Sequence, residues 1–442
     1  DFRARLHLPY YDYIPQRGLK NLAKYKYSGL DLSIIAKYIL HPFWTWLANF
    51  LPEWPAPNLI TFAGFVPCLA SFMLTAYYCP TLTEAPPQWL CALNFVCLWL
   101  YQTLDALDGK QARRTGTSSP LGELFDHGCD ALTTIFVGLS VACTIRLGSQ
   151  VLLFVLVTGM LVPFYTTQWE EYFTGTLVLG YIGVTEAQMT TLAIYLAGAF
   201  VGTDIYVQEY TVFGITAKGG LFLMFFATAS SVGHVIYNCI TVYKQWKQGK
   251  ATAYNALGYL GPVTSVVIAS TLWLIWDDSV ITQHAHLYCL MLGLLVANFV
   301  GRIIVYRVCA LDAAFFPELL LPLFIGAANS ALGNPLCSTA TAVMLNFVFY
   351  GVAYLHFAVC IINQMTTYLN IRCFIIPVPN LASNPPVKPA GGVPTPVPEV
   401  AAVQAQHNNH HNNTSSSGES PSKRKSRSPN LSPTASRRPV KV

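Results

Sequence analysis

Charged side chains are scarce in this sequence. Asp, Glu, Lys and Arg make up 11% of its 442 residues, whereas soluble globular domains contain about 25%. Hydrophobic residues make up 53%, and they gather in runs about as long as a bilayer is thick, roughly 20 residues each. The scarcity of charge therefore excludes an ordinary soluble domain and predicts a polytopic membrane protein.

Cysteines at zinc-binding spacing and a basic surface on the main body are also missing. The twelve cysteines lie mostly inside apolar runs without nearby histidines, so we expect free, buried thiols and no zinc site. The formal charge is +5, but from Pro379 onward the chain holds eight Lys and Arg against two Glu. The rest of the chain therefore carries about −1. A body without a basic surplus is not expected to bind nucleic acid.

The apolar runs predict an all-α fold of about ten transmembrane helices. Residues 1–57 would form an N-terminal segment, 58–243 the first part of the membrane core, 244–378 the C-terminal helices, and 379–442 a disordered basic tail poor in large apolar residues. Within 32–51, aromatic and aliphatic residues alternate with few basic groups, which predicts an amphipathic helix in the headgroup region. The predicted spans are 58–78, 88–107, 124–146, 151–168, 187–204, 219–243, 256–276, 284–306, 317–333 and 338–363.

The distribution of Lys and Arg predicts that both termini are cytoplasmic. Cytoplasmic loops hold an excess of basic residues, and with this orientation the basic clusters at 20–26, 110–114 and 244–250 lie on the same side as the tail. The opposite loops carry almost none. An even number of spans is favoured, although eight or nine remain possible if 187–204 and 317–333 are re-entrant.

Acidic residues concentrate at one place, where the second predicted span ends and the third begins. Asp105 and Asp108 are three residues apart, and Asp126 and Asp130 are four apart, so each pair shares a helix face. If the two helices pack antiparallel across the polar turn, the four carboxylates converge. Because carboxylates at close range repel each other in a medium of low dielectric, they would need cations.

Oxygen-only ligands suit hard divalent ions such as Mg²⁺ or Mn²⁺, and a pair of these ions can stabilise both sides of a phosphoryl displacement. Gly109, Gly122 and Gly128 leave room for a close approach, and Arg113 adds a planar donor suited to phosphate. The segment therefore predicts a site for two divalent ions and a phosphate-containing substrate.

The same segment resembles the signature of the CDP-alcohol phosphotransferase family, D-x2-D-G-x2-A-R followed by G-x3-D-x3-D, with every fixed position filled from Asp105 to Asp130. The stretches APNLIT at 56–61, GKQARRTG at 109–116 and SSPLGELFDHGCDAL at 118–132 resemble the eukaryotic choline/ethanolamine phosphotransferase branch. The resemblance extends over about residues 10–375. One departure is Gly116, where that branch usually has Asn.

The resemblance implies a residue-by-residue assignment of the site. Asp105, Asp108 and Asp126 would hold one Mg²⁺ or Mn²⁺ ion, and Asp105, Asp126 and Asp130 the other. Two further residues, Asn58 and Arg113, would bind the CDP-alcohol, and His127 would be the base that deprotonates diacylglycerol.

The placement of His127 also favours the role of a base on its own. Glu123 lies four residues earlier on the same helix face, where it could accept a hydrogen bond from the imidazole and favour its protonated form. The alternative is a histidine that only packs or caps.

The implied reaction transfers phosphocholine or phosphoethanolamine from CDP-choline or CDP-ethanolamine to diacylglycerol, with release of CMP. The resemblance also implies a homodimer in the membrane of the endoplasmic reticulum, the Golgi or both. An ethanolamine-only enzyme of the same family remains an alternative, although the HGCDAL ending favours the choline or dual-specificity branch. An intramembrane Mg-dependent prenyltransferase would place its aspartate motifs in separate halves of the chain, and a cation transporter would place acidic residues in several spans.

Overall fold

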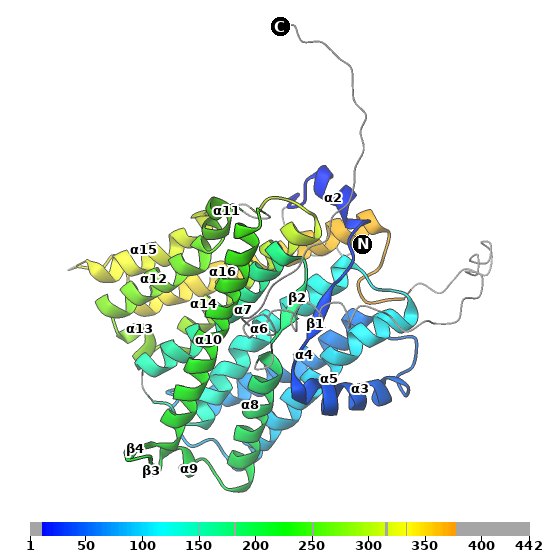
Figure 1. Ribbon diagram of the computed structural model, residues 1–442. Coiled ribbons are helices and arrows are strands. Elements are labelled where there is room, and N and C mark those ends of the chain that lie inside the picture. The colour runs from blue at the N-terminus through cyan, green and yellow to red at the C-terminus, as the bar shows by residue number, and fades with distance from the viewer. Residues whose placement is uncertain are drawn as a thin grey trace, which may run out of the picture. The chain divides into compact units, whose positions relative to one another are not determined.

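Nearly all of the regular structure is helical (Figure 1). The computed structural model describes residues 11–148, 150–180, 183–249, 252–313, 317–332 and 334–376. The helices are α2 (Gln16–Leu22), η1 (Ala36–Leu40), α3 (His41–Ala48), α4 (Pro57–Tyr78), α5 (Gln88–Thr115), α6 (Pro120–Thr144), α7 (Gln150–Thr174), α8 (Val184–Phe200), α9 (Asp204–Val207), α10 (Gly219–Lys247), α11 (Ala253–Gly258), α12 (Gly261–Trp276), α13 (Ser279–Thr282), α14 (Ala285–Val308), η2 (Pro317–Leu320), α15 (Leu321–Ala331) and α16 (Thr339–Leu369).

Each of the ten predicted spans falls on a helix, which confirms the all-α membrane fold. Within the described residues, six helical segments are long and apolar enough to cross a bilayer, so the number of about ten stays a prediction: α4, α5, α10, Asn255–Trp276, α14 and α16. The weakest candidate is α15, because its 11 residues extend only about 17 Å at 1.5 Å per residue, against a hydrocarbon core of about 30 Å. A re-entrant segment at 317–333 therefore stays open.

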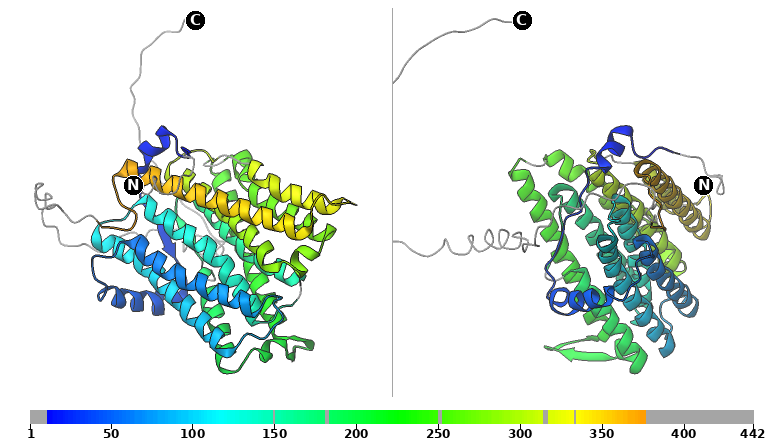
Figure 2. Two further views of the ribbon diagram at one scale, coloured as in Figure 1. Left: turned by 180° about the vertical axis from the view of Figure 1, so that it is seen from behind. Right: turned by 90° about the vertical axis from the view of Figure 1, so that its right-hand side faces the viewer.

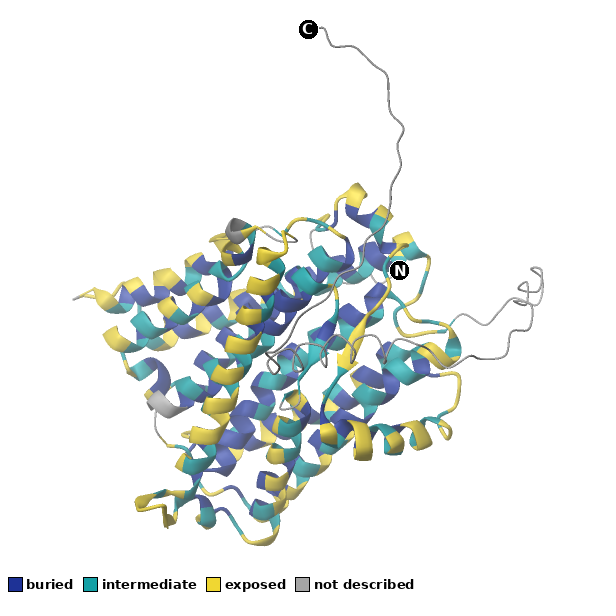
Figure 3. Ribbon diagram, viewed as in Figure 1, coloured by how far each residue is buried: buried dark blue, intermediate teal, exposed yellow. Residues whose placement is uncertain are grey.

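Helix α14 lies at the centre of the bundle. Of its most apolar window 83% is buried by other helices, compared with 11% for α10. Figure 3 shows the difference, since α10 is largely exposed along its length. The apolar surface of α10 is the kind that lipid covers in a membrane protein, whereas α14 packs against α6, α7 and α16.

The close packing of α14 against α16 depends on Gly301. A Cβ atom added there would lie 2.7 Å from Cε1 of Phe357, so a side chain cannot be accommodated without displacing the ring. We expect Gly301→Ala to destabilise the protein by about 1–3 kcal/mol, measured as a lower melting temperature in detergent. The matched control is Gly351→Ala on α16, where no atom lies within 4 Å of the added Cβ; an equal loss in both variants would contradict this account.

Two short strand pairs were not predicted from the sequence. Strand β1 (Gly29–Asp31) pairs in parallel with β2 (Leu177–Leu179), and β3 (Glu209–Val212) pairs antiparallel with β4 (Ile215–Lys218). The β3–β4 hairpin projects from one end of the bundle in both views of Figure 2. The β1–β2 pair ties the N-terminal segment to the residues that follow α7.

The predicted amphipathic segment at 32–51 is helical, as η1 and α3. Several of its large apolar side chains, among them Tyr38, Trp46 and Phe50, are exposed, as a helix in the headgroup region would require, whereas Leu40 and Trp44 are buried against the protein. The C-terminal end of α5 holds this segment in place: Lys110 Nζ donates to Thr45 Oγ1 at 2.9 Å, and Arg114 Nη1 donates to the carbonyl of Ala48 at 2.7 Å. Its position in the headgroup region stays a prediction.

Chain contacts divide the protein into two units, Asp1–Val378 and Pro379–Val442, and the division falls where the composition changes. The predicted disordered basic tail, 379–442, lies outside the described residues. The boundaries at 57/58 and 243/244 stay predictions. All twelve cysteines are free, as predicted; nine are also buried, whereas Cys337 and Cys373 are partly buried and Cys239 is exposed.

Candidate active site

The turn between α5 and α6 is four residues long and fixes the geometry of the acidic segment. Gly116 ends α5 in the left-handed conformation, with φ of +66°, a conformation that glycine and asparagine adopt most readily. Ser119 caps α6 by accepting a hydrogen bond from the amide of Gly122 at 3.1 Å, and Pro120 occupies the first turn. The short connection brings the end of α5 against the start of α6.

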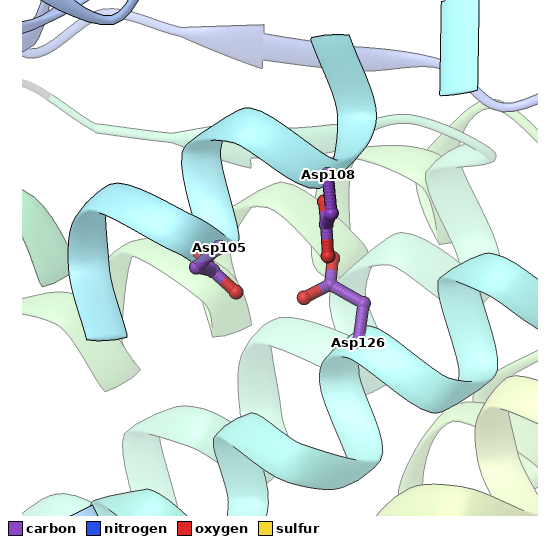
Figure 4. A group of neighbouring side chains, drawn as sticks. All are labelled: Asp105, Asp108 and Asp126. Carbon is purple, nitrogen blue, oxygen red and sulfur yellow. The ribbon is translucent and has the colours of Figure 1, made fainter. Parts of the chain in front are cut away.

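The structure brings three of the four predicted carboxylates together. Ligand oxygen atoms of Asp105 and Asp108, on α5, and of Asp126, on α6, all lie within 4.8 Å of one another. Figure 4 shows the three side chains pointing toward a common space between the two helices. Asp130 is not in this group. It lies one turn farther along α6, and its Oδ1 accepts a hydrogen bond from Tyr101 Oη at 2.7 Å.

The oxygens of this acidic group suit divalent cations. Asp108 accepts a hydrogen bond from the hydroxyl of Thr61, but within the described residues the buried Oδ1 atoms of Asp105 and Asp126 have no hydrogen-bond partner. A buried carboxylate oxygen without a partner is costly, and the repulsion between neighbouring carboxylates adds to that cost. Hard divalent ions with oxygen ligands would remove both penalties, so the residues present fit Mg²⁺ or Mn²⁺.

Asn58 and Arg113 flank the acidic group. Asn58 lies at the start of α4, where its Oδ1 is 3.7 Å from the position that a Cβ on Gly122 would occupy, and its Nδ2 donates to Cys373 Sγ at 3.5 Å. Arg113 is an exposed residue, and its Nη1 lies 3.5 Å from the position that a Cβ on Gly109 would occupy, one turn earlier on α5. Within the described part of the chain, no hydrogen bond or ion pair holds the guanidinium. The buried Asn58 and the exposed Arg113 thus both lie beside glycines of the motif.

The prediction of a hydrogen bond between His127 and Glu123 was wrong. The two oxygens of Glu123 accept instead from the hydroxyl of Tyr25 and from Nη2 of Arg307. The buried Nδ1 of His127 has no hydrogen-bond partner among the described residues. Glu123 remains one helical turn before His127, so that its charge acts on the imidazole without a direct bond.

The sequence did not predict three residues that surround Glu123: Tyr25, Glu171 and Arg307. Nη1 of Arg307 donates to Tyr25 Oη at 2.9 Å and forms an ion pair with Glu171 Oε1 at 3.1 Å. Burial, followed by the charge of Glu123, raises the pKa of the Tyr25 hydroxyl, which keeps it protonated as a donor. These residues are far from the motif in the sequence, so no local pattern connects them with it. The one available signal was Arg307, a single arginine at the end of an apolar run.

Within the described residues, two buried acidic residues lie outside α5 and α6. Helix α7 continues past the predicted end of its span to Thr174, and it carries the buried residues Glu170 and Glu171. Glu171 is paired with Arg307, so it does not form part of a row of carboxylates along a transport pathway. The acidic residues of α7 therefore belong to the surroundings of the α5–α6 site.

Comparisons with known proteins identify the same region. Residues 54–227 match the family model described as CDP-alcohol phosphatidyltransferase. A Dictyostelium discoideum protein described as "uncharacterized CDP-alcohol phosphatidyltransferase class-I family protein 2" is 35% identical over 377 residues, 84% of this chain and 90% of the relative. Arabidopsis thaliana choline/ethanolaminephosphotransferase 1 is 37% identical over 82% of this chain and 98% of the relative. Human ethanolaminephosphotransferase 1 is 31% identical over 84% of this chain and 96% of the relative.

Proposed function

Because this chain belongs to the CDP-alcohol phosphatidyltransferase family, we propose that it transfers phosphocholine, phosphoethanolamine or both from the CDP-alcohol to diacylglycerol. The products are phosphatidylcholine or phosphatidylethanolamine, and CMP. The observation that carries the proposal is the convergence of Asp105, Asp108 and Asp126, within a motif whose spacing matches the family. Family membership removes the prenyltransferase alternative.

In this proposal the chain's acidic residues hold two divalent ions. Asp105, Asp108, Asp126 and Asp130 would be the ligands, and the ions, when bound, neutralise the diphosphate of the donor. Arg113 contributes a planar donor for phosphate oxygens, and within the described residues no hydrogen bond or ion pair occupies its guanidinium. Asn58 offers a side-chain amide beside Gly122, where it would contact the CDP part of the donor.

The transfer is a direct displacement. The hydroxyl oxygen of diacylglycerol forms a bond to the β-phosphorus while the bond from that phosphorus to the oxygen bridging it to the α-phosphorus breaks, and CMP leaves. His127 takes the hydroxyl proton, because it is buried beside Asp126 and its Nδ1 has no hydrogen-bond partner in the described part of the chain. No covalent intermediate on the enzyme is needed.

Removal of the metal tests the proposal on the unmodified enzyme. Purified protein in lipid nanodiscs containing diacylglycerol should release CMP from CDP-choline or CDP-ethanolamine, and EDTA should reduce the rate at least about a hundredfold, since the displacement depends on metal-stabilised charge. Readdition of Mg²⁺ or Mn²⁺ should restore it, and the two titrations identify the preferred ion. A rate that EDTA leaves unchanged would contradict the proposal.

The same assay addresses the head group. We propose dual specificity, because the relatives include enzymes named for both alcohols and for ethanolamine alone, and because the HGCDAL ending favours the choline or dual branch. Turnover with CDP-ethanolamine and none with CDP-choline would establish the ethanolamine-only alternative.

We further propose a homodimer in the endoplasmic reticulum or Golgi membrane, with both termini cytoplasmic. The family resemblance supports the dimer and the compartment. For the orientation, the support is the grouping of basic loops, together with contacts between segments predicted on one side, such as Pro55 with Ile375. Protease protection of epitope-tagged termini tests the orientation. Imaging of a fluorescent fusion tests the compartment, and chemical cross-linking tests the dimer.

A further inference from the structure

The carboxylate of Glu123 is held from two directions by residues outside the region that the family model covers. The hydroxyl of Tyr25, in the N-terminal segment, donates to Oε2, and Nη2 of Arg307, at the end of α14, donates to Oε1. The family model matches residues 54–227. The motif helix α6 therefore carries an acidic residue whose orientation is set by the N-terminal segment and by α14.

Tyr25 and Arg307 also contact each other, which makes the arrangement rigid. Nη1 of Arg307 donates to Tyr25 Oη at 2.9 Å, and the guanidinium lies 5.8 Å from the centre of the tyrosine ring. The arginine is fixed from the far side by Glu171, which is fully buried on α7. A buried, bridging arginine of this kind loses little conformational freedom when it binds a carboxylate.

The position of Glu123 on α6 explains why it needs to be held. It lies three residues before Asp126 and four before His127, so all three share a helix face. A buried carboxylate without a partner turns toward the nearest positive charge, and next to the acidic group that charge would be a divalent ion. Glu123 would then become an additional metal ligand and compete with the substrate.

We propose that Arg307 and Tyr25 are positioning residues that hold Glu123 beside His127 and away from the metal ions. The inference rests on the proposed function, because it concerns the same site. It adds to the motif one residue from the N-terminal segment and one from α14, so that the site is complete only when both of these segments pack against α6.

The test uses full-length enzyme in nanodiscs and compares Arg307→Gln and Tyr25→Phe with the wild type. Loss of an outer partner costs about 10–100-fold in activity, and we expect kcat to fall by that range for Arg307→Gln and about tenfold for Tyr25→Phe. KM for the CDP-alcohol should change less than about threefold, because neither residue contacts the donor. The more conservative Arg307→Lys should recover part of kcat.

A double variant separates positioning from a general structural role. If Arg307 acts through Glu123, Arg307→Gln combined with Glu123→Gln should be no slower than Glu123→Gln alone, because residues in one network are not additive. Losses that multiply would overturn the inference, and so would a rise in KM that accounts for the whole effect. Melting temperatures are measured for every variant, and Tyr25→Phe, which removes one oxygen atom, decides the matter if the arginine variants do not fold.

Matched controls lie away from the site. Arg146→Gln removes an arginine paired with Asp204, and Tyr165→Phe removes a buried hydroxyl that donates to the carbonyl of Tyr259; both should keep kcat within about twofold. A wild-type enzyme that releases no CMP from either donor would overturn the proposed function together with the inference. An active wild type with kcat unchanged in Arg307→Gln and Tyr25→Phe would overturn the inference alone.

Discussion

Replacing Asp126 with Asn is expected to reduce the rate of CMP release by about a thousandfold or more. Asp126 is the residue of α6 that meets both Asp105 and Asp108, and the family resemblance assigns it to both ions. An amide of the same shape keeps the packing but removes the negative charge that the ions need, and loss of electrostatic stabilisation of this kind costs orders of magnitude in rate. Steady-state CMP release at saturating Mg²⁺ measures the effect.

The control for this variant is Asp204→Asn. Asp204 is an exposed carboxylate paired with Arg146, and its loss should leave the rate within about twofold. The Asp126→Asn protein should also elute and melt like the wild type, because relief of repulsion between carboxylates offsets the loss of a charge that has no hydrogen bond at Oδ1. A folded Asp126→Asn enzyme with a rate near that of the wild type would contradict the assignment of Asp126 as a metal ligand.

The second large effect is expected for His127→Ala. This variant should lose transfer by a factor of about 10²–10⁴, the range that a positioned general base contributes, while it still binds metal and CDP-alcohol. The expectation follows from the proposed roles, in which His127 takes the proton from diacylglycerol, whereas the carboxylates and Arg113 bind the donor. Calorimetry measures the binding of CDP-choline, and single-turnover rates measure the transfer step. Together they separate a loss of proton transfer from a loss of donor binding.

Equal loss of binding and turnover in His127→Ala would instead make His127 a structural residue. The comparison variant is His234→Ala, in which the lost interaction is an interhelical hydrogen bond to Thr167 at 2.8 Å. That variant is expected to lower the melting temperature more than the rate.

The local part of the site was accessible from the sequence because helical spacing is fixed. Residues three or four apart share a face, so the motif predicts which side of α5 holds Asp105 and Asp108 once the helix is assigned. The connection was equally local. Gly116 and Ser119 are typical of a helix end and a helix start, and they determine how α5 meets α6.

The remaining features depend on contacts between residues far apart in the chain. Tyr25 and Glu123 are separated by 98 residues and Arg307 and Glu123 by 184, and no pattern in a single sequence pairs them. The predicted bond between Glu123 and His127 failed for this reason, since the nearby partner was visible and the stronger, distant partners were not. The β1–β2 pair was not predicted for the same reason, because its strands are only three residues long and are far apart in the sequence, although they pair in the structure.

The most direct test of the central claim is a count of bound ions. Titration of the full-length protein with Mn²⁺ in the presence of CDP-choline, followed by electron paramagnetic resonance of the free ion, measures how many ions each chain binds. We expect about two ions per chain, with a magnetic interaction between them, and loss of tight binding in the Asp105→Asn and Asp126→Asn variants. Wild-type protein that binds no Mn²⁺, or variants that bind as many ions as the wild type, would contradict the account.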